Sequence, residues 1–177
     1  MTMLKPRLML IIGMIAAAAA ARLLPHPPNM TPIFAVALFG GATLTDRRLA
    51  FLVPLAAMFL SDLVLGFHNE MVAVYGAFVL IVCLGLWLQQ RKTPLTIAGA
   101  AVATSLIFFV ISDFGIWLTG DMYPRTFAGL VACYTAALPF LRNQLFGDLL
   151  YTAILFGGFA LLERRFPVLK APGPLAA

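Results

Sequence analysis

The sequence predicts an all-α integral membrane protein, a single transmembrane domain with six spanning helices. Composition is the first reason, because 62% of the 177 residues are hydrophobic and only 11% are charged, with a mean hydropathy of +0.98. Soluble domains carry about 25% charged residues, so this chain has too few charges to cover a water-facing surface. The other two reasons are the lengths of its apolar runs and the placement of lysine and arginine between them.

The apolar runs define the expected spans. A helix needs roughly 20 mostly apolar residues to cross a bilayer, and six runs approach that length. We expect spans at about 8–24, 31–44, 49–66, 71–89, 95–118 and 142–163. A shorter apolar piece at about 126–139 follows Pro124 and ends at Pro139. Because proline favours a helix start and interrupts a helix interior, we expect this piece to be a separate, outer interfacial or re-entrant helix.

The first apolar run has two interpretations. Lys5 and Arg7 precede it and small residues fill positions 16–21, as in a cleavable signal peptide. Alternatively the helix is retained, and its alanines allow a neighbouring helix to approach closely. The later spans keep the same orientation in both cases.

Lysine and arginine predict the orientation. If six spans alternate, nine of the twelve basic residues fall on one side of the membrane, and only Arg22, Arg125 and Arg142 fall on the other. The positive-inside rule then places both termini in the cytoplasm. Because the basic residues behind the net charge of +5 flank the spans in this way, the charge does not indicate nucleic acid, and we expect the lipid bilayer as the partner.

The other polar residues gather on the opposite, outer side, in or near loops 25–30, 67–70 and 119–141. This asymmetry predicts a binding site there. The candidate residues are Arg22, His26, Asn29, Asp62, His68, Tyr75, Asp113, Trp117, Tyr123, Arg125, Tyr134, Arg142, Asn143 and Asp148.

Asp62, Asp113 and Asp148 are the most informative of these residues. Each lies inside an apolar run, where a carboxylate costs several kcal/mol unless it faces a partner or a wet cavity. The outer arginines lie at comparable depth, and a guanidinium can hold a carboxylate through two hydrogen bonds. Such pairs either form a solute site or simply tie helix ends together.

The remaining chemistry-bearing residues leave further alternatives. A metal site of His26 and His68 with Asp62 or Glu70 matches no known ligand spacing, so we expect neither a metal nor a cofactor. Trp117, Tyr123 and Tyr134 are suited to an aromatic lid or to the interfacial aromatic belt. Cys83 and Cys133 lie in apolar runs and indicate no disulfide framework. Gly40-Gly41 indicates close helix packing.

Four blocks of the chain resemble an uncharacterised family of small bacterial membrane proteins. They are Arg-Leu-Leu-Pro-His-Pro-Pro-Asn-Met-Thr-Pro-Ile (22–33), Leu-Ser-Asp-Leu-Val-Leu-Gly-Phe-His (60–68), the run from Tyr-Pro-Arg to Leu-Pro-Phe (123–140), and Arg-Asn-Gln-Leu-Phe-Gly-Asp (142–148). That family is distantly similar to the S-components of energy-coupling-factor (ECF) vitamin transporters and to solitary cobalamin transporters.

The resemblance implies an S-component-like bundle in the bacterial inner membrane, with a substrate pocket beneath the first, third and fifth loops. It places His26, Asp62, Tyr75 and Arg142 where the cobalamin-transporting relatives have pocket residues. Those relatives have a cysteine as cobalt ligand where this chain has Tyr75, and a phenol is poorly suited to that bond. S-components dock on an energising module through small residues spaced four apart in the first helix. Here that spacing is offered by Ala16 and Ala20, or by Ala17 and Ala21.

Three functional hypotheses follow. The first is a non-enzymatic transport protein that binds a vitamin-like small solute, with cobalamin or a related compound as the best guess, from the outer side. The second is an interfacial membrane enzyme that uses the outer His and Asp residues, which requires them to converge on one metal-sized point. The third is a structural subunit, which requires closed salt bridges without a cavity. An outward cavity larger than roughly 300 Å³ would separate the first from the third.

Overall fold

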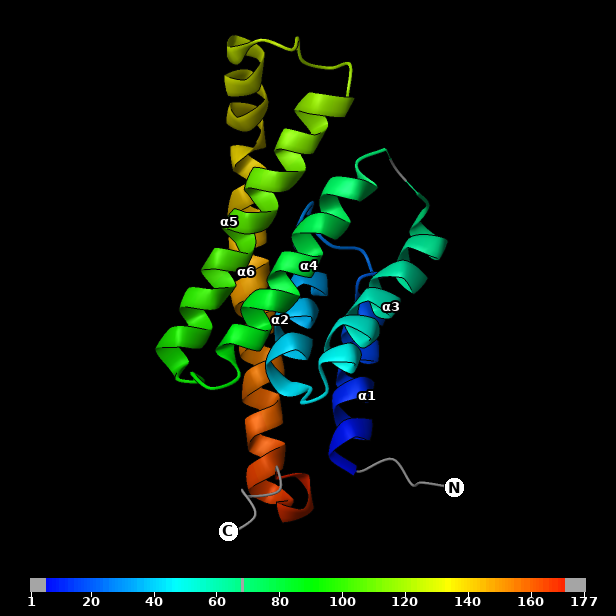
Figure 1. The fold of residues 1–177 in the computed structure, drawn as a ribbon, viewed down its shortest axis with the longest axis vertical. Helices are drawn as coiled ribbons and strands as arrows, with labels where there is room; N and C mark the ends of the chain where they lie inside the picture. The colour runs from blue at the N-terminus through cyan, green and yellow to red at the C-terminus, as the bar shows by residue number, and fades with distance from the viewer. Residues whose placement is uncertain (1–5, 68, 171–177) are drawn as a thin grey trace.

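The described chain, residues 6–67 and 69–170 of a computed structural model, is built from six α-helices (Figure 1). They are α1 (Pro6–Ala21), α2 (Ile33–Thr43), α3 (Arg47–Leu65), α4 (Met71–Leu88), α5 (Pro94–Thr119) and α6 (Phe127–Arg165), and a 3₁₀ turn, η1 (Pro167–Leu169), follows them. No strand occurs among the described residues. The all-α prediction is therefore confirmed.

Side-chain caps start three of these helices. The Asp46 carboxylate accepts hydrogen bonds from the backbone N–H of Arg48 and Leu49 at the start of α3. Thr93 and Thr96 form a reciprocal capping box before α5, and Thr126 caps α6. Each cap satisfies backbone donors that the first helical turn leaves free, so the helix starts are set locally.

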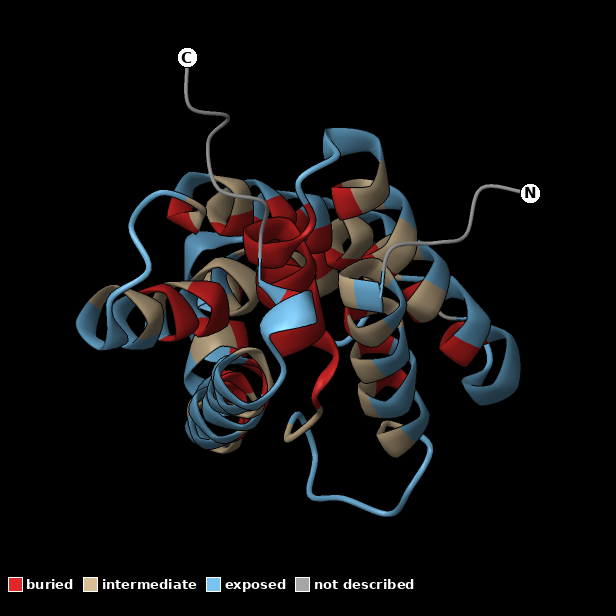
Figure 2. Ribbon diagram, turned by 90° about the horizontal axis from the view of Figure 1, so that it is seen from below, coloured by how far each residue is buried: buried red, intermediate tan, exposed pale blue. Residues whose placement is uncertain are grey.

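Helix α2 forms the centre of the bundle. All eleven of its residues are buried, and Figure 2 shows the buried residues concentrated in the middle of the molecule. At 1.5 Å per residue α2 is about 16 Å long, roughly half of the hydrocarbon thickness of a bilayer. The span expected at 31–44 is thus a short, enclosed helix. Its apolar character comes from burial among other helices on every side.

Glycines let α2 and α4 pack with their backbones in contact. A Cβ atom on Gly41 would lie 2.4 Å from the carbonyl oxygen of Val82, and one on Gly85 would lie 2.5 Å from that of Leu38. On α3, Pro54 packs against Gly40 so tightly that a Cβ there would lie 2.4 Å from its Cγ. The prediction of close packing at Gly40-Gly41 is confirmed.

Helix α6 differs from the sequence-based expectation. We expected an outer helix at about 126–139 and a separate span at 142–163, but α6 runs unbroken through Pro139. Proline removes one backbone donor, and transmembrane helices tolerate this loss where nearby side chains satisfy freed groups. Pro139 and Thr135, whose carbonyl loses its helical donor, are both exposed on α6.

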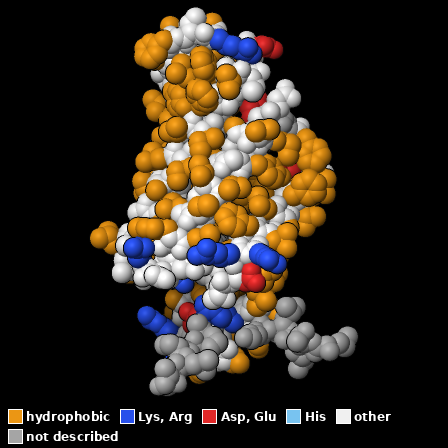
Figure 3. Space-filling model, in the orientation of Figure 1, with side chains coloured by type: hydrophobic (Ala, Val, Ile, Leu, Met, Phe, Trp, Pro, Cys, Tyr) orange, Lys and Arg blue, Asp and Glu red, His pale blue; other side chains and the backbone are white. Residues whose placement is uncertain are grey.

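Four helices, α3 to α6, are long and apolar enough to cross a membrane, whereas α1 and α2 are apolar but shorter. The number of six spans therefore remains a prediction. The two ends of the described chain lie together, because Arg7 pairs with Glu163 and donates to the carbonyl oxygen of Leu169 at 2.8 Å. Figure 3 shows lysine and arginine side chains in a band near this end, with a largely apolar surface above them.

Candidate functional site

A cavity of about 470 Å³ lies at the end of the bundle opposite Arg7 and Glu163. Three connections line it: the α1–α2 loop contributes Asn29 and Thr31, the α3–α4 turn contributes Glu70, and the α5–α6 loop contributes Met122 and Tyr123. These are the first, third and fifth loops, and each of them contributes at least one residue to the same hollow.

The α1–α2 loop is held over this end of the bundle by its own backbone and by α6. Met30 donates its backbone N–H to the carbonyl of Pro27, and Asn29 adopts a left-handed conformation with φ of 60°, which asparagine tolerates better than most residues. The side chain of Asn143 donates to the carbonyl of Pro28 at 3.2 Å. Asn143 is therefore a support for the loop, and Asn29 lines the cavity.

His26 is exposed and turned back on its own loop. Its ring nitrogens lie 3.0 Å from the carbonyl oxygen of Pro27 and 3.2 Å from that of Arg22. Both contacts are to backbone carbonyls of the same loop. His26 does not line the cavity, and its contacts shape the loop.

Arg22 links the cavity to a buried carboxylate. Its Nη1 atom donates to Asp62 Oδ1 and to the hydroxyl of Ser61, each at 2.6 Å, and lies 3.4 Å from the sulfur of Met58. The hydroxyl of Tyr75 donates to the other Asp62 oxygen at 2.8 Å. Asp62 is fully buried, and both of its carboxylate oxygens are occupied. Asp62 and Tyr75 thus position Arg22, which itself lines the cavity.

Asp113 provides the opposite charge on the α5 side of the cavity. It is 9% exposed, and its carboxylate has no hydrogen-bond or ion-pair partner among the described residues. The hydroxyl of Ser112 also borders the cavity, and donates to the carbonyl of Phe108 one turn earlier. With Glu70 from the α3–α4 turn, the cavity lining holds one cationic side chain, Arg22, and two acidic ones, Glu70 and Asp113.

Aromatic and aliphatic side chains form the rest of the lining. The rings of Phe34 and Phe108 pack with centroids 4.1 Å apart, and Phe140 and Met58 add further apolar surface. A cavity that is mostly apolar with a few convergent polar groups is the usual form of a small-molecule site.

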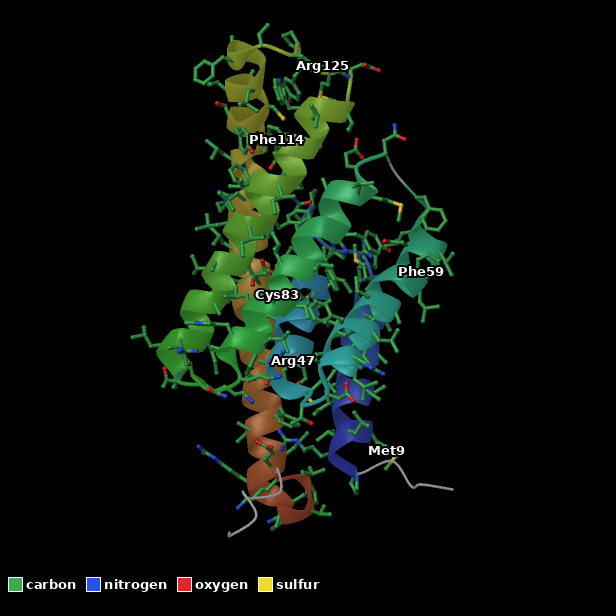
Figure 4. All side chains as sticks on the ribbon, in the orientation of Figure 1. Met9, Arg47, Phe59, Cys83, Phe114 and Arg125 are labelled. Carbon is green, nitrogen blue, oxygen red and sulfur yellow. The ribbon has the colours of Figure 1, made fainter. Side chains whose placement is uncertain are left out.

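Other predicted site residues lie outside this cavity. Trp117 donates its indole N–H to the carbonyl of Pro124, and Tyr134 donates its hydroxyl to the carbonyl of Val110. Figure 4 shows Arg125 at the tip of the α5–α6 connection. Arg142 is exposed on α6. Tyr123 is the one member of the expected aromatic lid that lines the cavity.

Asp148 is buried deeper, between α5 and α6, and accepts a hydrogen bond from the hydroxyl of Ser105 at 2.7 Å. His68 lies outside the described residues. Among the residues that the structure does describe, no group of three His, Cys, Asp or Glu side chains could hold a metal ion. Cys83 and Cys133 are both free thiols.

Sequence reasoning missed several lining residues. Ser112 lines the cavity directly, and Ser61 contacts the lining residue Arg22. Each serine precedes an intramembrane aspartate, and this repeated Ser-Asp pair inside apolar runs was a signal that could have found them. No such signal marks Phe34, Phe108 and Phe140. A phenylalanine in an apolar run fits equally well against lipid, the protein core or a ligand, so the sequence does not distinguish these environments.

The alanine stripe of α1 borders a different hollow. A groove of about 440 Å³ lies between α1 and α3, and it is lined by Ala16 and Ala20 together with apolar side chains such as Leu52 and Ala56. Ala17 and Ala21 do not line it. Of the two expected docking pairs, Ala16 and Ala20 are therefore the one that faces a groove.

The fold and the cavity together define the class: an all-helical protein whose long apolar helices are suited to a membrane, with one mixed polar and apolar cavity at the end away from the basic band. The chain belongs to the DUF6580 family, a family of unknown function whose model matches residues 2–169. The expected membership of an uncharacterised family is thereby confirmed. Neither the curated proteins nor the solved structures contain a match to this chain.

Proposed function

We propose that this chain binds a small, vitamin-like solute in the cavity between Arg22 and Asp113 and mediates its uptake across a membrane. The observation that carries the proposal is the combination of an unpartnered, nearly buried carboxylate with a guanidinium across one apolar hollow. An intramembrane ionisable residue without a partner is costly and is usually retained for function.

The lining indicates the chemistry of the solute. Nη1 of Arg22 makes the contacts to Ser61 and Asp62, and a guanidinium has five N–H donors, so the remaining ones are available to a carboxylate or carbonyl group. Asp113 would accept from an amine, amide or hydroxyl group, and the Phe34 and Phe108 rings would pack on an apolar ring. We infer a compact ring compound with donors at one edge and acceptors at the other.

The cavity volume favours a solute smaller than cobalamin. At about 470 Å³ it falls within the range of roughly 300–1,000 Å³ that is typical for drug-sized ligands. Tyr75 stands at the position that the resemblance associates with a cobalt ligand. Its hydroxyl donates to Asp62 instead. Both observations support a smaller vitamin or a vitamin precursor.

The direction of transport and the energy source belong to the same proposal. The basic band near Arg7 and Arg165 favours a cytoplasmic location for that end, so the cavity would open to the outer side of a bacterial inner membrane. The groove at Ala16 and Ala20 would be the contact with an energising module, if the protein uses one.

Uptake tests the proposal. Bacterial strains that cannot make individual vitamins are supplied with the labelled compound while they express this chain. We expect accumulation of at least one compound, a strong decrease in Asp113→Asn, and normal accumulation in Arg142→Gln, which changes an exposed residue outside the cavity. Failure of every compound, or normal uptake by Asp113→Asn, would overturn it.

A further inference from the structure

A second polar cluster lies inside the bundle, below the cavity, and the proposed uptake function does not use it. Ser105 on α5 contacts Asp148 on α6, and Asp148 lies near Gln144 on the same helix. Two further buried hydroxyl side chains follow on these helices: Thr104 precedes Ser105 directly on α5, and Thr152 lies one turn after Asp148 on α6. The exposed fractions of these five side chains are between 0% and 2%. The cavity ends close to these residues. Phe108, one turn from Thr104 on α5, and Phe140, one turn from Gln144 on α6, still line it.

Three oxygen atoms, Oδ1 of Asp148 and the hydroxyl oxygens of Thr104 and Thr152, have no hydrogen-bond partner within the described part of the chain. The other Asp148 oxygen accepts from Ser105 at 2.7 Å and lies 3.5 Å from the Gln144 amide nitrogen. Among the described residues, no lysine or arginine pairs with Asp148. Each unsatisfied buried polar atom costs about 1–3 kcal/mol, so three together require an explanation.

Helix periodicity directs the side chains that carry the unpartnered oxygens toward one helix, α2. Phe108 follows Thr104 by one turn and packs on Phe34 of α2. Phe156 and Phe159 follow Thr152 by one and two turns, and both pack edge-on against Phe39 of α2. Residues three or four apart share a helix face, so Thr104 and Thr152 are both directed toward α2. Asp148 precedes Thr152 by one turn on that face.

The chemistry of these groups favours a cation. Carboxylate and hydroxyl oxygens are ligands that hard cations prefer, and a single carboxylate balances a single positive charge. A carboxylate that is buried without a counter-charge carries a large desolvation cost. A bound monovalent cation would cancel this charge and satisfy the three free oxygens at once.

We propose that Asp148, Thr104 and Thr152, supported by Ser105, form a binding site for a small monovalent cation of the sodium type at the junction of α2, α5 and α6. This inference goes beyond the proposed uptake function and does not depend on it, because the site is made of different residues and its ligand is a different species.

Thermal unfolding of the purified, full-length protein tests the site, with the intrinsic fluorescence of Trp87 and Trp117 as the signal. Sodium chloride is titrated against choline chloride at constant ionic strength. We expect a saturable rise in Tm with sodium, about 5–11 °C at a hundredfold excess over Kd, and saturable binding of one ²²Na⁺ per chain. The rise should disappear in Asp148→Asn.

A matched set of threonine variants keeps the test decisive if Asp148→Asn does not fold. Thr152→Val should lose most of the sodium response, Thr152→Ser should retain it because it keeps the hydroxyl, and Thr135→Val should behave as wild type because that exposed hydroxyl bonds within its own helix. Equal Tm values in sodium and choline, a response to pH without one to sodium, or an unchanged response in Thr152→Val would overturn the proposal.

Discussion

At the scale of single residues, the Arg22–Asp62 pair has the clearest energetic role. Asp62 is fully buried, and its two carboxylate oxygens accept from Arg22 and Tyr75. The pair joins the end of α1 to α3, and Tyr75 extends the network to α4. One group therefore holds three helices together and orients a guanidinium at the cavity wall.

Removing one partner of this pair should lower the free energy of unfolding more than removing both. We expect Arg22→Leu to lower the free energy of unfolding by about 3 kcal/mol or more, because it leaves a buried carboxylate without its counter-charge. The double variant Arg22→Leu/Asp62→Leu should recover a large part of that loss. Unfolding in detergent with a chemical denaturant measures both, and a double variant less stable than Arg22→Leu would contradict this role.

The sequence predicted the depth of these residues better than their direction. Arg22 and Asp62 were expected at the same depth, and they form a pair. Arg142 was expected beside them at comparable depth, but it lies on an exposed face of α6, whereas Gln144 and Asp148 lie on the buried face. Position in an apolar run gives height along a helix, and the direction of a side chain depends on tertiary packing that this pattern does not show.

At the scale of secondary-structure elements, α2 is the helix on which the others pack, and its glycines set the distance to α4. A methyl group on Gly41 would overlap the Val82 carbonyl, which belongs to the backbone and cannot rotate away. Gly76, on the same helix α4, has no atom within 4 Å of the position where a Cβ would lie.

The two glycines should respond oppositely to alanine. We expect Gly41→Ala to destabilise the protein by about 1–3 kcal/mol through overpacking. Gly76→Ala should be neutral or stabilising by up to about 1 kcal/mol, because alanine is the better helix former. Midpoints of thermal unfolding compare the two directly, and equal effects would mean that α2 and α4 are not packed as closely as described.

The continuity of α6 makes a prediction about distance. If residues 131 and 146 belong to one helix, their backbones lie about 22 Å apart. Spin labels on Val131→Cys and Phe146→Cys, both exposed positions, should report one narrow distance distribution near this value in a background without Cys83 and Cys133. A much shorter or broad distribution would favour the two-helix arrangement that Pro139 suggested in the sequence.

At the scale of the whole molecule, the bundle has two unlike ends. One end carries the basic band and both ends of the described chain, and the other carries the cavity and three loops. Composition and the lengths of the apolar runs were sufficient to predict the all-helical class and the helices α3, α4 and α5, whereas α6 was expected as two pieces. It could not show that the run at 31–44 is an enclosed helix, because lipid and a protein interior select the same apolar residues.

The orientation of these ends is open to a labelling test. In intact cells, a membrane-impermeant maleimide should label Arg125→Cys, at the tip of the α5–α6 connection. It should label Arg47→Cys, at the start of α3, only after the membrane is permeabilised. Labelling of Arg47→Cys alone in intact cells would reverse the orientation and place the cavity on the cytoplasmic side.

Ligand binding by a cavity-filling variant tests the central claim most directly. Ala136 lines the cavity, whereas Ala132, one turn earlier on α6, is exposed and does not. We would measure the Tm shift that each compound of a vitamin panel produces in purified wild type, Ala136→Trp and Ala132→Trp. The account predicts that at least one compound raises the Tm of wild type and Ala132→Trp and leaves that of Ala136→Trp unchanged. An equal shift in all three proteins, or no shift with any compound, would contradict it.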